Sequence, residues 1–278
     1  MDSNSGKIFQ KIRKHRHFKS TDFLPEISKA TIYRFERGEV DISLSKFLFA
    51  LHKMNISLRE FESYATNFHH IQAEEDTTQL YFYFYHRDTT ALKNLVATAD
   101  DAIFRIAALS LYNELTTGKS LVIPLQEALV DFLFEVNDWG TYELTILNAT
   151  ISQLAPKRIS LILESLREQT TYHNEVFHFS RRVSQIYLKG AFTFIRTDYQ
   201  QKARKALDYA ENFTKSDDLF SQNLIYFMLG AFDYKFGDKQ KGLSEMREAN
   251  HIFECLHSEH HADFLRFMVE KYLHIEKL

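Results

Sequence analysis

Apolar residues recur every three or four positions through most of this 278-residue chain, which is the spacing of one face of an α-helix. Near the start, Ile8, Phe9 and Ile12 share such a face, and short helices are expected after them over residues 21–26 and 28–38. Blocks of alternating apolar and polar residues, typical of strands, do not interrupt this pattern. The sequence therefore predicts an all-α protein.

The third predicted helix has clear signals at both ends. Ser28 can accept hydrogen bonds from the first-turn amides as an N-cap, and Gly38 can take the left-handed conformation that ends a helix. Ile32 and Phe35 lie three residues apart and are expected to pack inward. The outer face is then basic and rich in hydrogen-bonding groups, with Lys29, Thr31, Tyr33, Arg34 and Arg37. Such a helix is typical of the DNA-reading element of a helix-turn-helix.

Two further helices complete a small N-terminal domain. Ser43 is expected to cap the fourth helix, and Ser57 with Glu60 has the spacing of a capping box at the start of the fifth. The inward residues of these two helices are expected to be Leu44, Phe47, Leu48, Leu51, Leu58 and Phe61. The sequence thus predicts a five-helix DNA-binding domain over residues 1–66.

The rest of the chain is organised as a linker and a series of helices. Residues 67–78 contain acidic and histidine side chains and few apolar ones, so a linker is expected there. The aromatic run from Tyr81 to Tyr85 is expected to pack between helices rather than to form a strand. Breaks, which predict about ten or eleven helices over residues 79–278, fall at Asp88, Asp100, Gly118, residues 137–140, Pro156, residues 197–198, residues 216–218, Gly237 and Ser258.

A repeat with an offset of 40 residues lies in the C-terminal half. Gly190-Ala191-Phe192 recurs as Gly230-Ala231-Phe232, and the same offset relates Asp198 to Asp238, Gln200 to Gln240 and Phe213 to Phe253. Small residues where two helices approach, a break and a second amphipathic helix are typical of solenoids like those of tetratricopeptide (TPR) repeats. The sequence therefore predicts a TPR-like α-solenoid of helical hairpins, whose concave face suits an extended peptide.

Charge is distributed unevenly along the chain. Met1 to Thr66 holds 12 Lys plus Arg against 8 Asp plus Glu, a net +4, whereas the remainder holds 22 against 29, a net −7. This asymmetry is expected when only the N-terminal domain meets phosphate. The acidic balance of the remainder favours a peptide that carries Lys or Arg.

Composition narrows the class of protein further. Three Pro and eight Gly suit long helices, and a single Cys, Cys255, cannot build a disulfide framework. No signal peptide and no apolar stretch of the roughly 20 residues needed to span a membrane is evident. A cytoplasmic protein is therefore expected.

Two segments resemble one family of regulators. Residues 27–61, ISKATIYRFERGEVDISLSKFLFALHKMNISLREF, resemble the XRE-type helix-turn-helix at the N-terminus of Rgg/MutR-type transcriptional regulators of Gram-positive bacteria. Residues 132–148, FLFEVNDWGTYELTILN, resemble the effector domain of the same family. The resemblance implies a cytoplasmic homodimer that regulates transcription and whose helical repeats bind a short secreted peptide, although some members have no known peptide.

The chain departs from that family at two positions of the effector domain. In members that bind short hydrophobic peptides, an Asn and an Arg follow the Tyr-Glu segment, where Ala149 and Ser152 stand here, with Asn148 one place away. The residues expected to line the peptide groove are Asn148, Thr150, Tyr187, Phe194, Tyr226 and Phe227. Asn148 and Thr150 would bind the peptide backbone, and the aromatic residues would hold its apolar side chains.

For DNA, the paired reading helices of a dimer predict an approximately palindromic operator with half-sites about one helical turn apart. The residues expected to meet base edges are Thr31, Tyr33 and Arg34, and those expected to hold phosphates are Lys29, Arg37, Lys11 and Arg13. Arg13 has an alternative partner in Glu36, with which it would join the first helix to the third.

Other functions have less support in the sequence. Glu254, His257, His260 and His261 have spacings of three and four, but they lack the His-Glu-x-x-His order, so no metal site is predicted. Motifs for nucleotide binding or hydrolysis are absent from the sequence, so neither a cofactor nor an enzymatic activity is expected. Two alternatives remain: a repressor of the same fold that needs no peptide, and a TPR-like scaffold for protein partners.

Overall fold

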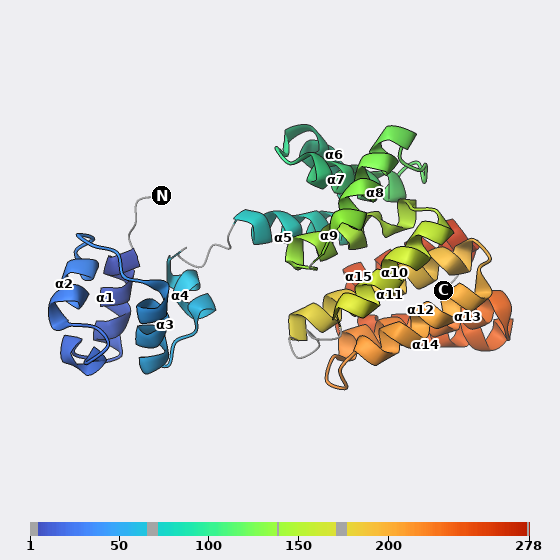
Figure 1. The fold of residues 1–278 in the computed structure, drawn as a ribbon. Helices are drawn as coiled ribbons and strands as arrows, with labels where there is room; N and C mark the ends of the chain where they lie inside the picture. Colours follow the sequence, from blue (N-terminus) through green and yellow to red (C-terminus); the bar gives the residue numbers. More distant parts are fainter. Residues whose placement is uncertain (1–4, 66–71, 138, 171–176, 277) are drawn as a thin grey trace. The chain divides into compact units, whose positions relative to one another are not determined.

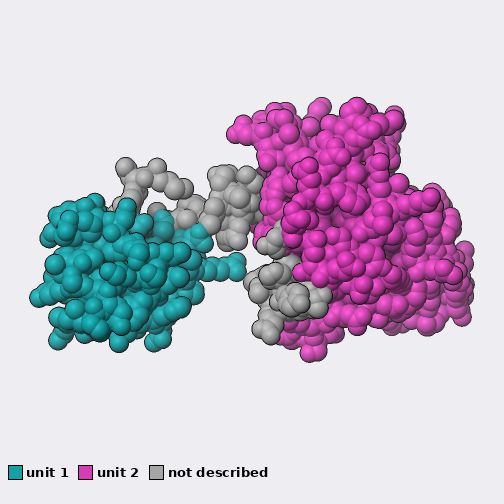
Figure 2. Space-filling model, viewed as in Figure 1, with its two compact units in different colours: residues 1–75 teal, residues 76–278 magenta. Residues whose placement is uncertain are grey.

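The computed structural model describes residues 5–65, 72–137, 139–170, 177–276 and 278. The chain divides into two compact units, Met1–Glu75 and Asp76–Leu278, which Figure 2 shows in teal and magenta. All regular structure among the described residues is helical (Figure 1), which confirms the all-α prediction. Among these residues, no helix is both long and apolar enough to cross a membrane.

Unit 1 is built around an aromatic core. Its elements are α1 (Ser5–His15), the 3-10 helix η1 (Ser20–Phe23), α2 (Lys29–Glu36), α3 (Leu44–Lys53) and α4 (Leu58–Ala65). Phe9 meets Phe35 edge-on with 5.5 Å between ring centroids, and Phe47 meets Phe61 in the same way at 4.8 Å. Edge-to-face pairs add to the stabilisation that burial of the rings provides. These ring contacts pack the inner face of α2 against α1 and α3.

The helices α1 and α2 touch through their backbones at Gly6. A Cβ atom on Gly6 would lie 1.9 Å from the carbonyl oxygen of Phe35, a distance that no packed pair of atoms allows. Glycine is therefore required at this crossing, and it fixes how closely the two helices approach.

The prediction of the second helix is wrong in its length and type. In place of a helix over residues 21–26, the structure has a single 3-10 turn that ends at Phe23. Leu24 is extended, with ψ of 150°, because a following proline disfavours the helical conformation at the preceding residue, and Pro25 follows.

The predicted burial of Leu44 and Leu58 is also wrong. Leu44 is 65% exposed and Leu58 is 48% exposed. Each is the first residue of its helix, where a side chain points back beyond the N-terminal end and leaves the core. Ser57 caps α4 as predicted, since its hydroxyl accepts the N–H of Glu60 at 3.0 Å. Ser43 occupies the N-cap position of α3 without a side-chain hydrogen bond to an amide.

From α5 onward, the described residues form eleven α-helices, as predicted. They are α5 (Gln72–Tyr85), α6 (Thr89–Thr98), α7 (Ala102–Leu115), α8 (Ile123–Glu135), α9 (Thr141–Thr150), α10 (Pro156–Thr170), α11 (Phe177–Arg196), α12 (Gln200–Phe213), α13 (Leu219–Phe236), α14 (Lys239–Cys255) and α15 (Glu259–Leu273), with the 3-10 helix η2 (Ile151–Gln153) after α9. Figure 1 shows α6, α7 and α8 in green and the long helices α11 to α14 in yellow to orange.

Aspartate N-caps explain why several helices begin where the sequence breaks predicted. The carboxylates of Asp88, Asp101 and Asp218 accept first-turn amides of α6, α7 and α13 at 2.9, 2.7 and 3.1 Å. Asp238 does the same for α14 at 2.9 Å. Each cap satisfies amides that have no partner within the helix.

The segment predicted to be a linker includes the start of a helix. Residues 72–78 belong to α5, while residues 67–71 lie outside the described residues. The stretch is polar but contains no Gly or Pro, and polarity alone does not prevent a helix from forming.

The repeated segments correspond to two successive hairpins, α11–α12 and α13–α14. In the second hairpin the backbones nearly touch: a Cβ atom on Gly242 would lie 2.4 Å from Gly230 O and 2.3 Å from Tyr234 N. In the first hairpin, Lys202 stands at the position of Gly242, and a Cβ atom on Gly190 would face side chains of α10 and η2 instead. The predicted close approach of small residues thus occurs only in the second hairpin.

Candidate DNA-binding helix and ligand cavity

The structure of α2 matches the predicted DNA-reading helix, although the helix is two residues shorter than the predicted ten or so. The Ser28 hydroxyl accepts the N–H of Thr31 at 3.1 Å, and Gly38 has φ of +73° just beyond the helix end. Ile32 and Phe35 are buried. The residues predicted to face outward do so: Lys29, Tyr33, Arg34 and Arg37 are exposed and Thr31 is half-buried.

The two arginines near the end of α2 differ in their partners. Arg37 donates two hydrogen bonds to Glu39, at 2.6 and 2.9 Å, and these bonds, together with its charge, lower the pKa of that carboxyl group. Arg34 Nε lies 3.9 Å from Glu39 Oε2, and its side chain is 57% exposed. The charge of Arg37 is thus partly neutralised by its neighbour, and Arg34 has more freedom to reach DNA.

Arg13 does not lie on the DNA-binding surface. Its guanidinium is 8% exposed and forms an ion pair with Glu36, with 2.5 Å between Nε and Oε1. It also donates to the carbonyl oxygen of Phe18 at 2.7 Å. The prediction of a phosphate contact for Arg13 is therefore wrong, and the alternative pairing with Glu36 is correct, because the residue faces the α1–α2 interface.

Lys11 is exposed on α1 and lines a basic groove between α1 and α4. The groove has a volume of about 250 Å³ and is lined by Lys7, Ile8, Lys11, Ile12, His15, Arg16 and Tyr64. Its basic side chains provide a second concentration of positive charge in unit 1, in addition to the outer face of α2.

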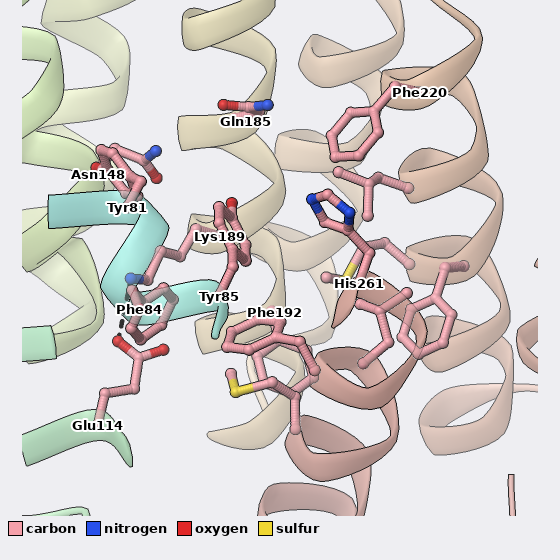
Figure 3. Close-up of a pocket in the computed structure, with 16 residues that line it drawn as sticks. Tyr81, Phe84, Tyr85, Glu114, Asn148, Gln185, Lys189, Phe192, Phe220 and His261 are labelled. Carbon is pink, nitrogen blue, oxygen red and sulfur yellow. Dashed lines mark ion pairs between the residues drawn. The ribbon is translucent and has the colours of Figure 1, made fainter. Parts of the chain in front are cut away.

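Unit 2 contains a cavity with two adjoining parts, which we call the inner chamber and the mouth. The inner chamber measures about 90 Å³ and the mouth about 430 Å³. Six residues line both parts: Tyr81, Tyr85, Asn148, Gln185, Phe220 and His261. Figure 3 shows Tyr81, Phe84 and Tyr85 of α5 on one side and Phe220 and His261 on the other. The remaining lining of the chamber is apolar except for Glu114 and Lys189.

An ion pair lies at one end of the inner chamber. Lys189 Nζ is 3.0 Å from Glu114 Oε2 and 4.9 Å from the centre of the Phe84 ring. The Ser152 hydroxyl donates to the same carboxylate oxygen at 2.8 Å. Burial lowers the pKa of Lys189, and the negative charge of Glu114 opposes that effect. The pair therefore carries no net charge toward the chamber when both groups are ionised.

Glu114 also connects the chamber to the last helix. Its carbonyl oxygen accepts hydrogen bonds from Lys271 Nζ at 2.7 Å and from the Tyr272 hydroxyl at 3.0 Å. Glu114 lies in the last turn of α7, where carbonyl groups have no partner within the helix. These bonds attach α15, which supplies His261, to α7.

The mouth is cationic. Arg182 Nη1 donates to the Thr145 hydroxyl at 2.9 Å, and the Arg181 guanidinium lies 4.6 Å from the centre of the Phe220 ring. Arg181 Nε is 3.5 Å from Asp218 Oδ2, and no Asp or Glu is found among the described residues that line the mouth. The described lining of the mouth therefore gives no support to the expected preference for a peptide with Lys or Arg, which stays a prediction.

The cavity includes two of the six residues predicted to bind a peptide, Asn148 and Phe227. Thr150 and Tyr187 are buried in the core, where the Tyr187 hydroxyl donates to the Leu163 carbonyl at 2.8 Å. Phe194 lines a separate depression beside α10 and α12. The Tyr226 hydroxyl donates a hydrogen bond to Glu248 at 2.7 Å, at the surface of the unit. The prediction that these four face one groove is wrong, since they lie on other faces of their helices.

The cavity residues that sequence reasoning missed do leave a pattern. Arg181, Gln185 and Lys189 follow one another at intervals of four, which places a polar stripe along one face of α11. A polar stripe on a long helix whose other residues are largely apolar and buried indicates a face turned toward a cavity. Tyr81, Phe84 and Tyr85 have the matching helical spacing on α5.

The histidines near α15 do not form a metal site. His257 has φ of +53° in the turn before α15, so it does not share a helix face with His261. His261 Nδ1 lies 2.8 Å from the Ser258 hydroxyl, and burial, together with the neighbouring His260, lowers the pKa of His261 to about 4. Within the described part of the chain, no group of three His, Cys, Asp or Glu residues is arranged to hold a metal ion.

Residues 97–266 match the C-terminal domain of the HTH-type transcriptional regulator Rgg. The chain belongs to the Rgg family. The Rgg match runs from α6 into α15 and includes most walls of the cavity, while α5 precedes it. The helix-turn-helix of unit 1 agrees with the description of the family as transcriptional regulators.

Solved structures share the fold over nearly the whole chain. The SHP pheromone receptor Rgg2 of Streptococcus dysgalactiae has a TM-score of 0.78 at 20% identity, and the match covers 96% of this chain and 99% of that chain. A protein from Listeria monocytogenes EGD-e has a TM-score of 0.81 at 16% identity, covering 98% and 97%. The PrgX/cCF10 complex has a TM-score of 0.69 at 10% identity, covering 99% and 94%. Together with the family match, they confirm an Rgg-type helix-turn-helix followed by helical repeats.

Proposed function

We propose that this protein binds operator DNA through α2 and that a short peptide in the cavity of unit 2 controls this binding. The observation that carries the proposal is that one Rgg-family chain combines an exposed basic reading helix with a cavity that has an apolar chamber and a polar mouth. The similar Streptococcus Rgg2 is a pheromone receptor, and PrgX was solved with cCF10. The proposed role is regulatory rather than catalytic.

On the DNA, Thr31, Tyr33 and Arg34 face the base edges, and Arg34 reads guanine through two parallel hydrogen bonds. Lys29 and Lys11, which are exposed, hold phosphates. Arg37 has a weaker role there because Glu39 occupies two of its hydrogen-bond donors.

The functional form is a cytoplasmic homodimer. Two copies of α2 enter successive major grooves, so the operator is approximately palindromic, with half-site centres about one helical turn apart. This geometry makes the spacing of the two half-sites a testable property of the DNA.

The peptide acts through differential binding. A ligand shifts an equilibrium only when it binds one arrangement of the protein more tightly than another. Tyr81 and Tyr85 line the cavity, and they belong to α5, the first helix after the helix-turn-helix unit in the sequence. A peptide that orders these side chains changes the helix through which the two units are connected along the chain.

A gel-shift experiment tests the proposal. The purified protein is titrated onto the DNA upstream of its own gene across a salt series, with and without conditioned medium from the source culture. Sequence-selective binding that weakens steeply with salt and changes with the medium supports it. Binding that the medium does not change would indicate a repressor that needs no peptide. A lack of binding at every salt concentration would indicate a scaffold for protein partners.

A further inference from the structure

The mouth of the cavity also defines the chemistry of the ligand, an inference that rests on the proposed peptide function. We propose that Arg181 and Arg182 bind a carboxylate of the peptide, either its C-terminus or an Asp or Glu side chain, while the inner chamber takes the apolar side chain beside it. Three features of the cavity support the proposal: the charge of the mouth, a buried arginine nitrogen without a well-formed hydrogen bond, and the polarity of the chamber.

No Asp or Glu compensates the charge of the mouth among the described residues that line it. Arg182 bonds to a neutral hydroxyl, that of Thr145. Arg181 meets Asp218 at 3.5 Å, but the two oxygens of Asp218 already accept the N–H and the hydroxyl of Ser221 at 3.1 and 2.7 Å. One guanidinium group of the mouth therefore has a carboxylate neighbour, and the other has none among the residues that the structure describes. A carboxylate ligand would supply the missing charge.

One nitrogen of the mouth is buried without a hydrogen bond. Arg181 Nε is inaccessible to solvent, and its contact with Asp218 Oδ2 at 3.5 Å does not have the geometry of a hydrogen bond. A buried donor without a good hydrogen bond is costly, and a ligand carboxylate that draws the Arg181 guanidinium into hydrogen bonds recovers that cost. Guanidinium groups present planar pairs of donors that suit the two oxygens of a carboxylate.

The inner chamber selects the neighbouring group. Phe192, Phe227 and Met268 are among its apolar lining residues, and Lys189 is paired with Glu114. The chamber therefore offers no free charge to a second ionic group. Asn148 and Gln185 line both the chamber and the mouth, where their amides can bind the peptide backbone between the two subsites.

A set of short peptides tests this assignment. Isothermal titration of the full-length protein compares acetyl-Leu-Phe-Leu with a free C-terminus, the same peptide as its C-terminal amide, acetyl-Leu-Phe-Asp-amide and acetyl-Leu-Phe-Lys-amide. We expect the free acid or the Asp peptide to bind about 10- to 100-fold more tightly than the neutral amide, and the Lys peptide to bind worst. The free acid and the Asp peptide distinguish a terminal from a side-chain carboxylate.

Two variants locate the effect. Arg181→Gln and Arg182→Gln should each remove most of the preference for the carboxylate, whereas Lys93→Gln, a matched loss of charge at an exposed site on α6, should retain it. Circular dichroism checks that each variant is folded. Retention of the preference in both arginine variants would overturn the inference.

The remaining outcomes are also decisive. Equal affinity for the acid and the amide would overturn the carboxylate subsite, and so would a lack of binding by every peptide at concentrations of about 1 mM. The proposed peptide control has a separate readout, since a response of DNA binding to conditioned medium would stand even when the carboxylate assignment fails.

Discussion

Arg13 of α1 and Glu36 of α2 form a buried ion pair at the interface of their two helices, with 2.5 Å between Nε and Oε1 and 3.0 Å between Nη2 and Oε2. Gln10 donates to the same carboxylate at 3.0 Å. The acidic residue of the reading helix is thereby turned away from the DNA-binding face and neutralised.

Removal of one partner should destabilise unit 1 strongly. Arg13→Ala leaves the Glu36 carboxylate buried with only a neutral amide as partner, which should lower the free energy of unfolding by about 3 to 5 kcal/mol. Urea unfolding followed by circular dichroism measures the loss. Arg16→Ala is the control, since Arg16 pairs with Glu60 at 3.0 Å in an exposed position and should cost less than about 1 kcal/mol. Equal losses in the two variants would contradict the structural role of the buried pair.

Arg34→Ala should weaken operator binding by about 1 to 3 kcal/mol and relax the preference at one base pair. Lys11→Ala should weaken binding to all sequences alike and reduce the salt slope by about 1. Gel shifts with a set of single-base operator variants separate the two effects. Undiminished, equally selective binding by Arg34→Ala would show that another element reads the DNA.

Gly242→Ala should separate α13 from α14, because the added methyl group would meet the Gly230 carbonyl and the Tyr234 amide at 2.4 and 2.3 Å. Overpacking of this kind costs about 1 to 3 kcal/mol. Thermal unfolding of the variant measures the loss. Gly237→Ala serves as the comparison, because its methyl group would meet a movable side-chain oxygen of Asp233 at 3.3 Å and should cost less. A loss there as large as that of Gly242→Ala would count against the close crossing.

His261 should make the folded protein less stable in acid. Burial, and the positive charges of His260, His86 and Arg181, lower the pKa of His261 from 6.5 to about 4. Between pH 6.5 and pH 4 the unfolded chain binds a proton that the folded chain does not, so this group lowers the free energy of unfolding as the pH falls and has no effect above that window. The slope stays below the limit of about 1.4 kcal/mol per pH unit, because the ring is partly solvated.

The contribution of His261 to the pH dependence of stability is obtained by comparing the wild type with a variant that lacks the imidazole. Urea unfolding of the wild type and of His261→Gln at a series of pH values should show a smaller acid-induced loss in the variant. Parallel pH profiles would mean that the ring is protonated as readily in the folded chain as in the unfolded one.

Much of unit 1 could be predicted because its signals are local. Ser28 and Gly38 act within one turn of their own positions, so sequence spacing is sufficient to place those helix ends, and the aspartate caps of unit 2 act in the same way. The burial of residues at helix starts could not be predicted from sequence spacing. Leu44 and Leu58 have the correct spacing, but they lie beyond the edge of a core whose limits depend on the packing of all the helices.

The cavity was harder to predict because its walls come from helices far apart in the sequence. Asn148 is predicted to bind the peptide from its place near the family's polar positions, and Tyr187 from its aromatic side chain. Asn148 faces the cavity, whereas Tyr187 packs in the core. The difference depends on the rotation of each helix about its axis in the packed unit. Periodicity within a single helix identifies the faces, but not the neighbour that each face meets.

The contact of the Glu114 carbonyl with Lys271 and Tyr272 has a consequence for biosynthesis. The cavity is bounded by α5, the first helix of unit 2, and by α15, its last, so a nascent chain has no ligand site until residue 272 has left the ribosome. Unit 1, whose contacts are local, can fold much earlier during translation. A ribosome-bound chain that ends before α15 would thus carry a reading helix that no ligand in this cavity can control.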